Sequence, residues 1–125
     1  MKTKSLQTIM EEHPNLCSVG YPTGWSSSDL PKLPDWRASL AADIEQFEKA
    51  RTWIAEHLEQ RKRINMYCGS YTLKHVCERH IGYVMNGTFI AAMIANGFAL
   101  HFNSSLNPYF NVTTTSIKRA NLTSP

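Results

Sequence analysis

Residues 70–97 read SYTLKHVCERHIGYVMNGTFIAAMIANG, and this segment predicts two short helices joined by a turn. The first helix begins at Ser70, a residue type that caps helices well, and Gly82 ends it. The second begins at Asn86 and ends at Asn96-Gly97, a pair that tolerates the left-handed conformation at a helix C-terminus. The inward faces carry Leu73, Val76, Cys77 and Ile81 in the first helix, and Phe89, Ile90, Met93 and Ile94 in the second.

The segment before this pair shows apolar residues at spacings of three, four and seven. They are Trp36, Leu40, Ile44, Phe47, Ile54 and Leu58. This spacing places all of them on one helical face, so it predicts a long amphipathic helix of about 25 residues that begins near Asp35. Its C-terminal end would carry Arg61, Lys62 and Arg63, where cations interact favourably with the helix dipole.

After the pair, residues 98–102 and 109–112 are β-prone runs on either side of a loop with hairpin composition. The predicted fold class is therefore mainly α (α+β): a long helix, a helix-turn-helix-like pair and a short C-terminal β-hairpin. This order resembles a winged helix-turn-helix. We expect an irregular Pro/Ser-rich arm over residues 1–34, one domain over residues 35–119, and a frayed C-terminus over residues 120–125.

Composition limits the class of protein without choosing its function. The chain has 125 residues and a net charge of +3, which fits one domain and permits contact with nucleic acid without requiring it. It shows no apolar segment typical of a secretion signal or a membrane span, so we expect a cytoplasmic protein with no membrane partner. Three irregularly spaced cysteines argue against a disulfide framework.

Nucleic-acid binding is the first functional hypothesis, because the predicted helix pair and hairpin match a DNA-binding layout. The second helix is a poor reader of bases, since residues 86–97 contain no Arg or Lys. Cations elsewhere would contact phosphates if they share one face of the protein. These candidates are Arg61, Lys62, Arg63, Lys74, Arg79, Lys118 and Arg119.

Two other surfaces carry alternative hypotheses. Tyr71, His75 and Glu78 form a polar stripe with Lys74 at helical spacing, which suits a small acid–base site but also an ordinary exposed helix face. Trp25, Tyr21 and Tyr83 are aromatic residues of the type that anchors protein interfaces. Cys77 and His80 are the one pair at metal-ligand spacing, and no phosphate-binding loop is present, so we expect neither a metal nor another cofactor.

A longer stretch resembles small, largely uncharacterised proteins encoded by bacteriophages and other mobile elements of bacteria. The resemblance lies in SYTLKHVCERHIGYVMNGTFIAA at residues 70–92 and NPYFNV at residues 107–112. It implies either a DNA-associated accessory protein or an inhibitor that occupies a host defence protein such as a CRISPR effector.

Together, the sequence predicts a non-enzymatic binding protein of a phage or mobile element. Its partner is expected to be DNA, contacted through a basic face, or else a host protein. A small acid–base enzyme that uses the polar stripe is the third hypothesis. The identity of the partner and the oligomeric state stay open at this point.

Overall fold

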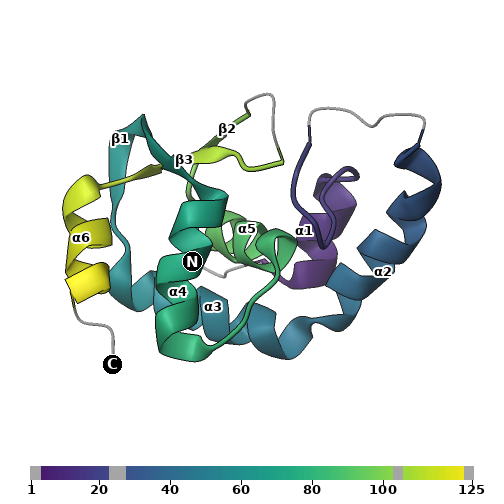
Figure 1. The fold of residues 1–125 in the computed structure, drawn as a ribbon, viewed down its shortest axis with the longest axis horizontal. Helices are drawn as coiled ribbons and strands as arrows, with labels where there is room; N and C mark the ends of the chain where they lie inside the picture. Colours follow the sequence, from purple (N-terminus) through teal and green to yellow (C-terminus); the bar gives the residue numbers. More distant parts are fainter. Residues whose placement is uncertain (1–3, 23–27, 103–105, 123–125) are drawn as a thin grey trace.

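A computed structural model describes residues 4–22, 28–102 and 106–122. It is an α+β fold, mainly helical, with a small three-stranded antiparallel sheet, so the predicted fold class is confirmed (Figure 1). In chain order the elements are α1 (Leu6–Glu12), η1 (Leu30–Lys32), α2 (Leu33–Ala42), α3 (Ile44–His57), β1 (Gln60–Gly69), α4 (Ser70–Ile81), α5 (Asn86–Ala95), β2 (Leu100–His101), β3 (Tyr109–Val112) and α6 (Thr114–Leu122).

The prediction of one long helix before residue 63 is wrong in two respects, and the first is a break at Asp43. Its backbone leaves the helical region at φ −91° and ψ 42°. Its carboxylate Oδ2 accepts a hydrogen bond of 2.7 Å from Thr88 Oγ1 on α5. The predicted apolar stripe is buried at Leu40, Phe47, Ile54 and Leu58, but the prediction is wrong for Ile44, which is 59% exposed just after the break. The periodicity therefore predicted most of the buried face, while a tertiary contact accompanies the break between α2 and α3.

The second error is that Arg61, Lys62 and Arg63 lie in a strand and not at a helix end. The chain becomes extended at Leu58, with φ −104° and ψ 144°. Thr113 N then donates a hydrogen bond of 2.9 Å to Glu59 O, and β1 pairs antiparallel with β3. Arg and Lys have good helix propensity, but pairing with a distant strand decides the structure here.

The predicted helix pair is confirmed as α4 and α5, with Gly82 at φ +89° and Gly97 at φ +83° where the chain leaves each helix. The predicted side-chain caps are wrong. Gly69 and Met85 occupy the capping positions, and Ser70 and Asn86 are the first residues of their helices. Ser70 Oγ instead donates a buried hydrogen bond of 3.0 Å to Asn86 Oδ1, which links the start of α4 to the start of α5.

The predicted hairpin is confirmed as β2 and β3, and β1 joins it to give the strand order β1-β3-β2. From α3 to β3 the elements follow as helix, strand, helix, helix, strand, strand. This is the element order of a winged helix.

The position of α5 differs from that of a helix that reads a DNA groove. It lies at the centre of the molecule, where α1, α3 and α4 pack against it (Figure 1). All of its residues except Ile94 are buried. A Cβ atom at Gly87 would lie 1.7 Å from the carbonyl oxygen of Cys17, so the N-terminal segment covers the start of this helix. The helix has no face that can enter a groove.

The N-terminal segment contributes to the same core. Leu6, Ile9 and Met10 on α1 are buried, as are Leu16 and Cys17. The cysteines Cys17, Cys68 and Cys77 are all buried and free. In the part of the chain that the structure describes, no helix combines the length and the apolar character needed to cross a membrane.

Candidate functional site

Six of the seven cations expected to contact nucleic acid are exposed, and they lie on three neighbouring elements. We call this set the basic surface. It consists of Arg61, Lys62 and Arg63 on β1, Arg79 on α4, and Lys118 and Arg119 on α6.

The triplet on β1 lies in a large irregularity of the sheet. Gln60 is opposite Val112 and Asn65 is opposite Phe110, so five residue steps on β1 match two on β3. Because β1 has more residues than β3 over this span, the residues between Gln60 and Asn65 cannot all pair with β3. Asn111 Nδ2 donates to Arg61 O at 2.9 Å and fixes one side of this irregularity. Bulges of this kind redirect side chains away from a regular ladder, and here the residues involved are two arginines and a lysine.

Helix α6 lies beside the start of β1 and beside α4 (Figure 1). Asn65 Nδ2 donates to Thr114 Oγ1 at 3.0 Å, and Arg119 Nη1 lies 3.6 Å from Glu59 Oε2. At the other end of α6, Arg79 donates a hydrogen bond to Asn121 Oδ1. These contacts join α4, α6 and β1, the three elements that carry the cations, although they are distant in the sequence.

Few acidic groups neutralise the basic surface. Within the described residues, the one ion pair formed by these cations joins Arg119 to Glu59, and both side chains of that pair are more than half exposed. Lys62, Arg63 and Lys118 form no ion pair with a described acidic residue. A surface with this excess of positive charge attracts phosphates and steers their approach.

Lys74 is the seventh expected cation, and the structure separates it from the basic surface. Its exposed fraction is 6%. Its Nζ lies 2.9 Å from Glu78 Oε2, and the ammonium also faces the rings of Tyr71 and Tyr83, at 5.5 and 5.1 Å from their centroids. As a buried and paired cation, Lys74 is not available for the phosphate contact expected of it. It belongs to a second site.

The second site is an open hollow of about 490 Å³ between α4, the turn after it and the N-terminal segment. We call it the tyrosine hollow. It is lined by Tyr71, Lys74, His75, Glu78, Tyr83, Met85 and Asn86, together with Ser18 and Val19. The polar stripe expected from the sequence thus lines the hollow, with His75 Nδ1 at 3.0 Å from Glu78 Oε1 and the His75 ring edge-on to Tyr71.

The protonation state of the Glu78 carboxyl is relevant to the acid–base hypothesis. Burial by itself raises the pKa of this carboxyl, but hydrogen bonds from Lys74 and from Val84 N outweigh it, and the net pKa is lowered. Glu78 is therefore a carboxylate at neutral pH, and its Oε2 is shared between Lys74 Nζ at 2.9 Å and Val84 N at 3.1 Å. An ion pair that also holds the turn after α4 is poorly placed to exchange protons with a substrate. The hollow is better suited to binding than to acid–base chemistry.

The aromatic residues expected at a protein interface are not brought together. Tyr83 is 71% exposed at the tyrosine hollow. Tyr21 is buried, and its hydroxyl and His13 Nδ1 form a hydrogen bond of 2.6 Å. Trp25 lies outside the described residues.

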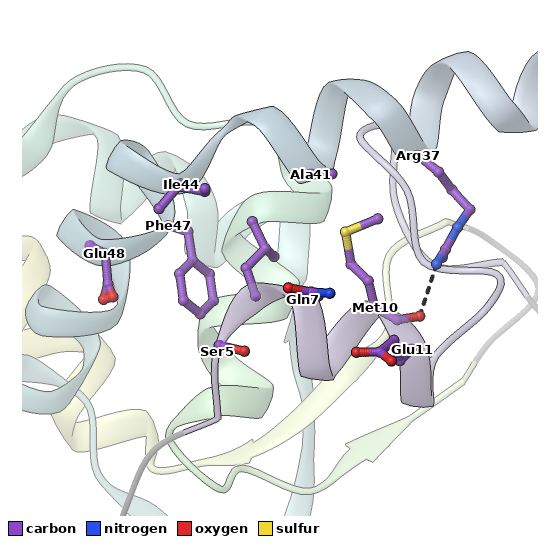
Figure 2. A pocket seen from close by; sticks show the side chains of 10 residues that line it. Ser5, Gln7, Met10, Glu11, Arg37, Ala41, Ile44, Phe47 and Glu48 are labelled. Atoms are coloured by element: carbon purple, nitrogen blue, oxygen red, sulfur yellow. Dashed lines mark hydrogen bonds between the residues drawn. The ribbon is translucent and has the colours of Figure 1, made fainter.

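Arg37 is an important residue that the sequence did not indicate. Its guanidinium donates to four backbone carbonyls of the N-terminal segment, at 2.8 to 3.0 Å: those of Met10, His13, Pro14 and Leu16. Figure 2 shows the bond to Met10 at the edge of an apolar groove of about 570 Å³ between α1 and the helices α2 and α3. Nη1 serves three of these carbonyls and Nη2 the fourth, so Arg37 fastens the N-terminal segment.

The pair at metal-ligand spacing has structural contacts instead. Burial, with a contribution from Glu78, raises the pKa of the Cys77 thiol to about 12. His80 Nε2 lies 2.9 Å from Ala120 O and so joins α4 to α6.

No family model, curated protein or solved structure matches this chain. The fold and the two sites define it as an α+β domain with a winged-helix-like order of elements, a buried central helix, an exposed basic surface and a separate tyrosine hollow.

Proposed function

We propose that this chain is a non-enzymatic nucleic-acid-binding protein that contacts phosphates through the basic surface. The observation that carries the proposal is the junction of β1 and α6, where the irregular segment with Arg61, Lys62 and Arg63 adjoins the helix with Lys118 and Arg119. Five exposed cations lie on these two adjoining elements, and among the described residues the one ion pair that they form is that of Arg119 with Glu59. Such an arrangement suits a polyanion.

The expected mode of binding is contact with the backbone and not with base edges in a groove. The buried α5 cannot act as a recognition helix, and the basic surface comes from a strand and two other helices. Contacts to phosphates position a protein without reading sequence, so binding should depend strongly on salt and little on duplex sequence.

Fluorescence anisotropy of a labelled duplex, titrated at several salt concentrations, tests the proposal. The variant Arg61→Ala/Lys62→Ala/Arg63→Ala should bind more weakly, and its salt slope should fall by up to about 3, since each lost phosphate contact removes about 1. The matched control is Lys4→Ala/Lys32→Ala/Lys49→Ala, which removes the same charge from three exposed positions away from the basic surface. It should keep most of the salt slope.

A duplex that does not bind at low salt would overturn the proposal. Equal losses in the two triple variants would also overturn it, because binding would then follow net charge and not the basic surface.

A second candidate function is the binding of a host protein, and one observation favours it. Met66 and Tyr67, on β1 close to the basic triplet, are exposed by 57% and 76%, which is unusual for neighbouring large apolar side chains. A pull-down from bacterial lysate treated with nuclease tests this function. A partner that survives nuclease and is lost in Met66→Ser/Tyr67→Ser would favour it over nucleic acid.

A further inference from the structure

We infer that the tyrosine hollow binds an unpaired nucleobase of a strand whose phosphates lie on the basic surface. This inference rests on the proposed function and adds a second site to it, together with a preference for single-stranded nucleic acid.

Two aromatic rings form walls of the hollow. Tyr71 and Tyr83 flank the same Lys74 ammonium, at 5.5 and 5.1 Å from their ring centroids, and both remain more than half exposed. Glu78, which pairs with Lys74, also accepts a hydrogen bond from Val84 N and so holds the turn that carries Tyr83 against α4. Exposed and well-positioned aromatic rings are what single-strand-binding proteins use to stack bases.

Polar groups also line the hollow. Ser18 lines the hollow, where its hydroxyl can donate or accept a hydrogen bond. Lys74 Nζ gives one of its three N–H groups to Glu78. The lining of the hollow therefore combines the donor groups of Ser18 and Lys74 with the rings of Tyr71 and Tyr83. A planar ring with carbonyl acceptors on its edge, as in thymine, uracil or guanine, matches both features.

A stripe of exposed side chains on α4 leads from the hollow to the basic surface. Tyr71, His75 and Arg79 are spaced by four residues on α4, and all three are exposed, so they form one stripe along the helix. The stripe is about 12 Å long at 1.5 Å per residue. Its far end is Arg79, which contacts Asn121 at the end of α6. A strand on the basic surface reaches the hollow along this stripe.

Anisotropy with three labelled ligands tests the inference. They are a dT strand of about 12 nucleotides, within the range of known single-strand sites, the same strand with abasic positions, and a duplex of equal length. The dT strand should bind about ten-fold or more tightly than the abasic strand, since stacking of one base is worth about that factor. Tyr71→Ala and Tyr83→Ala should each remove most of this difference but keep duplex binding, which also shows that the variants are folded.

Two further variants locate the base. Tyr71→Phe keeps an aromatic ring and should retain the difference between the dT strand and the abasic strand. Tyr67→Ala removes an equally exposed tyrosine outside the hollow and should also retain it.

The outcomes separate the two claims. If the dT strand, the abasic strand and the duplex bind alike with a strong salt dependence, the hollow takes no base while the proposed function stands. If Tyr67→Ala abolishes the difference and Tyr71→Ala does not, the base lies elsewhere and the inference is wrong. If none of the ligands binds at low salt, the proposed function fails and the inference fails with it.

Discussion

Nζ of Lys74 lies 2.9 Å from Oε2 of Glu78, one turn later on α4, and both side chains are largely shielded from water. The exposed fractions of the two side chains are 7% and 16%. An ion pair in this position differs from the exposed pairs elsewhere in the chain, because removing one partner leaves the other charge in a poorly hydrated place.

Lys74→Met should lower the free energy of unfolding by about 2 to 3 kcal/mol, because it leaves the Glu78 carboxylate without its ammonium partner. Urea denaturation measures the loss. Lys49→Met is the matched control, since Lys49 forms an exposed pair with Glu45 at 3.6 Å and should cost about 0.5 kcal/mol or less. Similar losses in the two variants would show that the buried pair has no special role in stability.

Glu78→Gln should reduce the dependence of stability on pH in the acid range. The pKa of Glu78 is lowered in the folded protein relative to its ordinary value of 4.5, so the unfolded chain binds its proton more readily. This contribution to stability is present above the unfolded pKa and is lost as the pH falls through the folded pKa. Between about pH 7 and pH 3 the native protein should therefore lose more unfolding free energy than Glu78→Gln, as followed by urea denaturation. Parallel pH profiles would contradict this assignment.

Arg37→Lys should loosen the N-terminal segment although it keeps the charge. A lysine cannot reproduce the planar set of donors that serves four backbone carbonyls. Amide hydrogen exchange should become faster in α1 and around Leu16, with a local loss of about 2 kcal/mol. Arg51→Lys, which alters a pair with Glu48 on α3, should leave α1 protected. Unchanged exchange in Arg37→Lys would show that apolar packing alone holds the segment.

Gly87→Ala should destabilise the protein severely. The added Cβ would lie 1.7 Å from Cys17 O, which is backbone and cannot move without separating the N-terminal segment from α5. We expect a loss of about 3 kcal/mol or more in urea denaturation. Gly82→Ala is the contrasting case, because its Cβ meets nothing within 4 Å and only the φ of +89° opposes it, at a cost of about 1 kcal/mol. If Gly87→Ala proves no worse than Gly82→Ala, the close contact is incorrect.

Local patterns predicted the helices α4 and α5 and the β2–β3 hairpin, because their signals lie within a few residues. Gly82 and Gly97 mark helix ends by a backbone preference that needs no tertiary context. The apolar stripe predicted Leu40, Phe47 and Ile54 as buried for the same reason, although it also included Ile44, which is exposed. These parts of the fold follow from short-range physical chemistry.

The elements that were predicted wrongly, namely the α2–α3 break and β1, depend on contacts with residues distant in the sequence. Asp43 contacts Thr88, and Glu59 pairs with Thr113, so neither the break between α2 and α3 nor the start of β1 is visible locally. The sites show the same contrast. Helical spacing predicted the stripe of Tyr71, His75 and Glu78, but it could not show that Lys74 turns inward. Nor does a composition pattern indicate that Arg37 binds carbonyls more than twenty residues away.

The central claim is that nucleic acid binds the basic surface, and the most direct measurement is amide chemical-shift mapping with a short duplex at low salt. The account predicts shifts in residues 59–65, around Arg79 and in the second half of α6, with little change along α2. Shifts concentrated on the apolar groove near Arg37, or an unchanged spectrum, would contradict it.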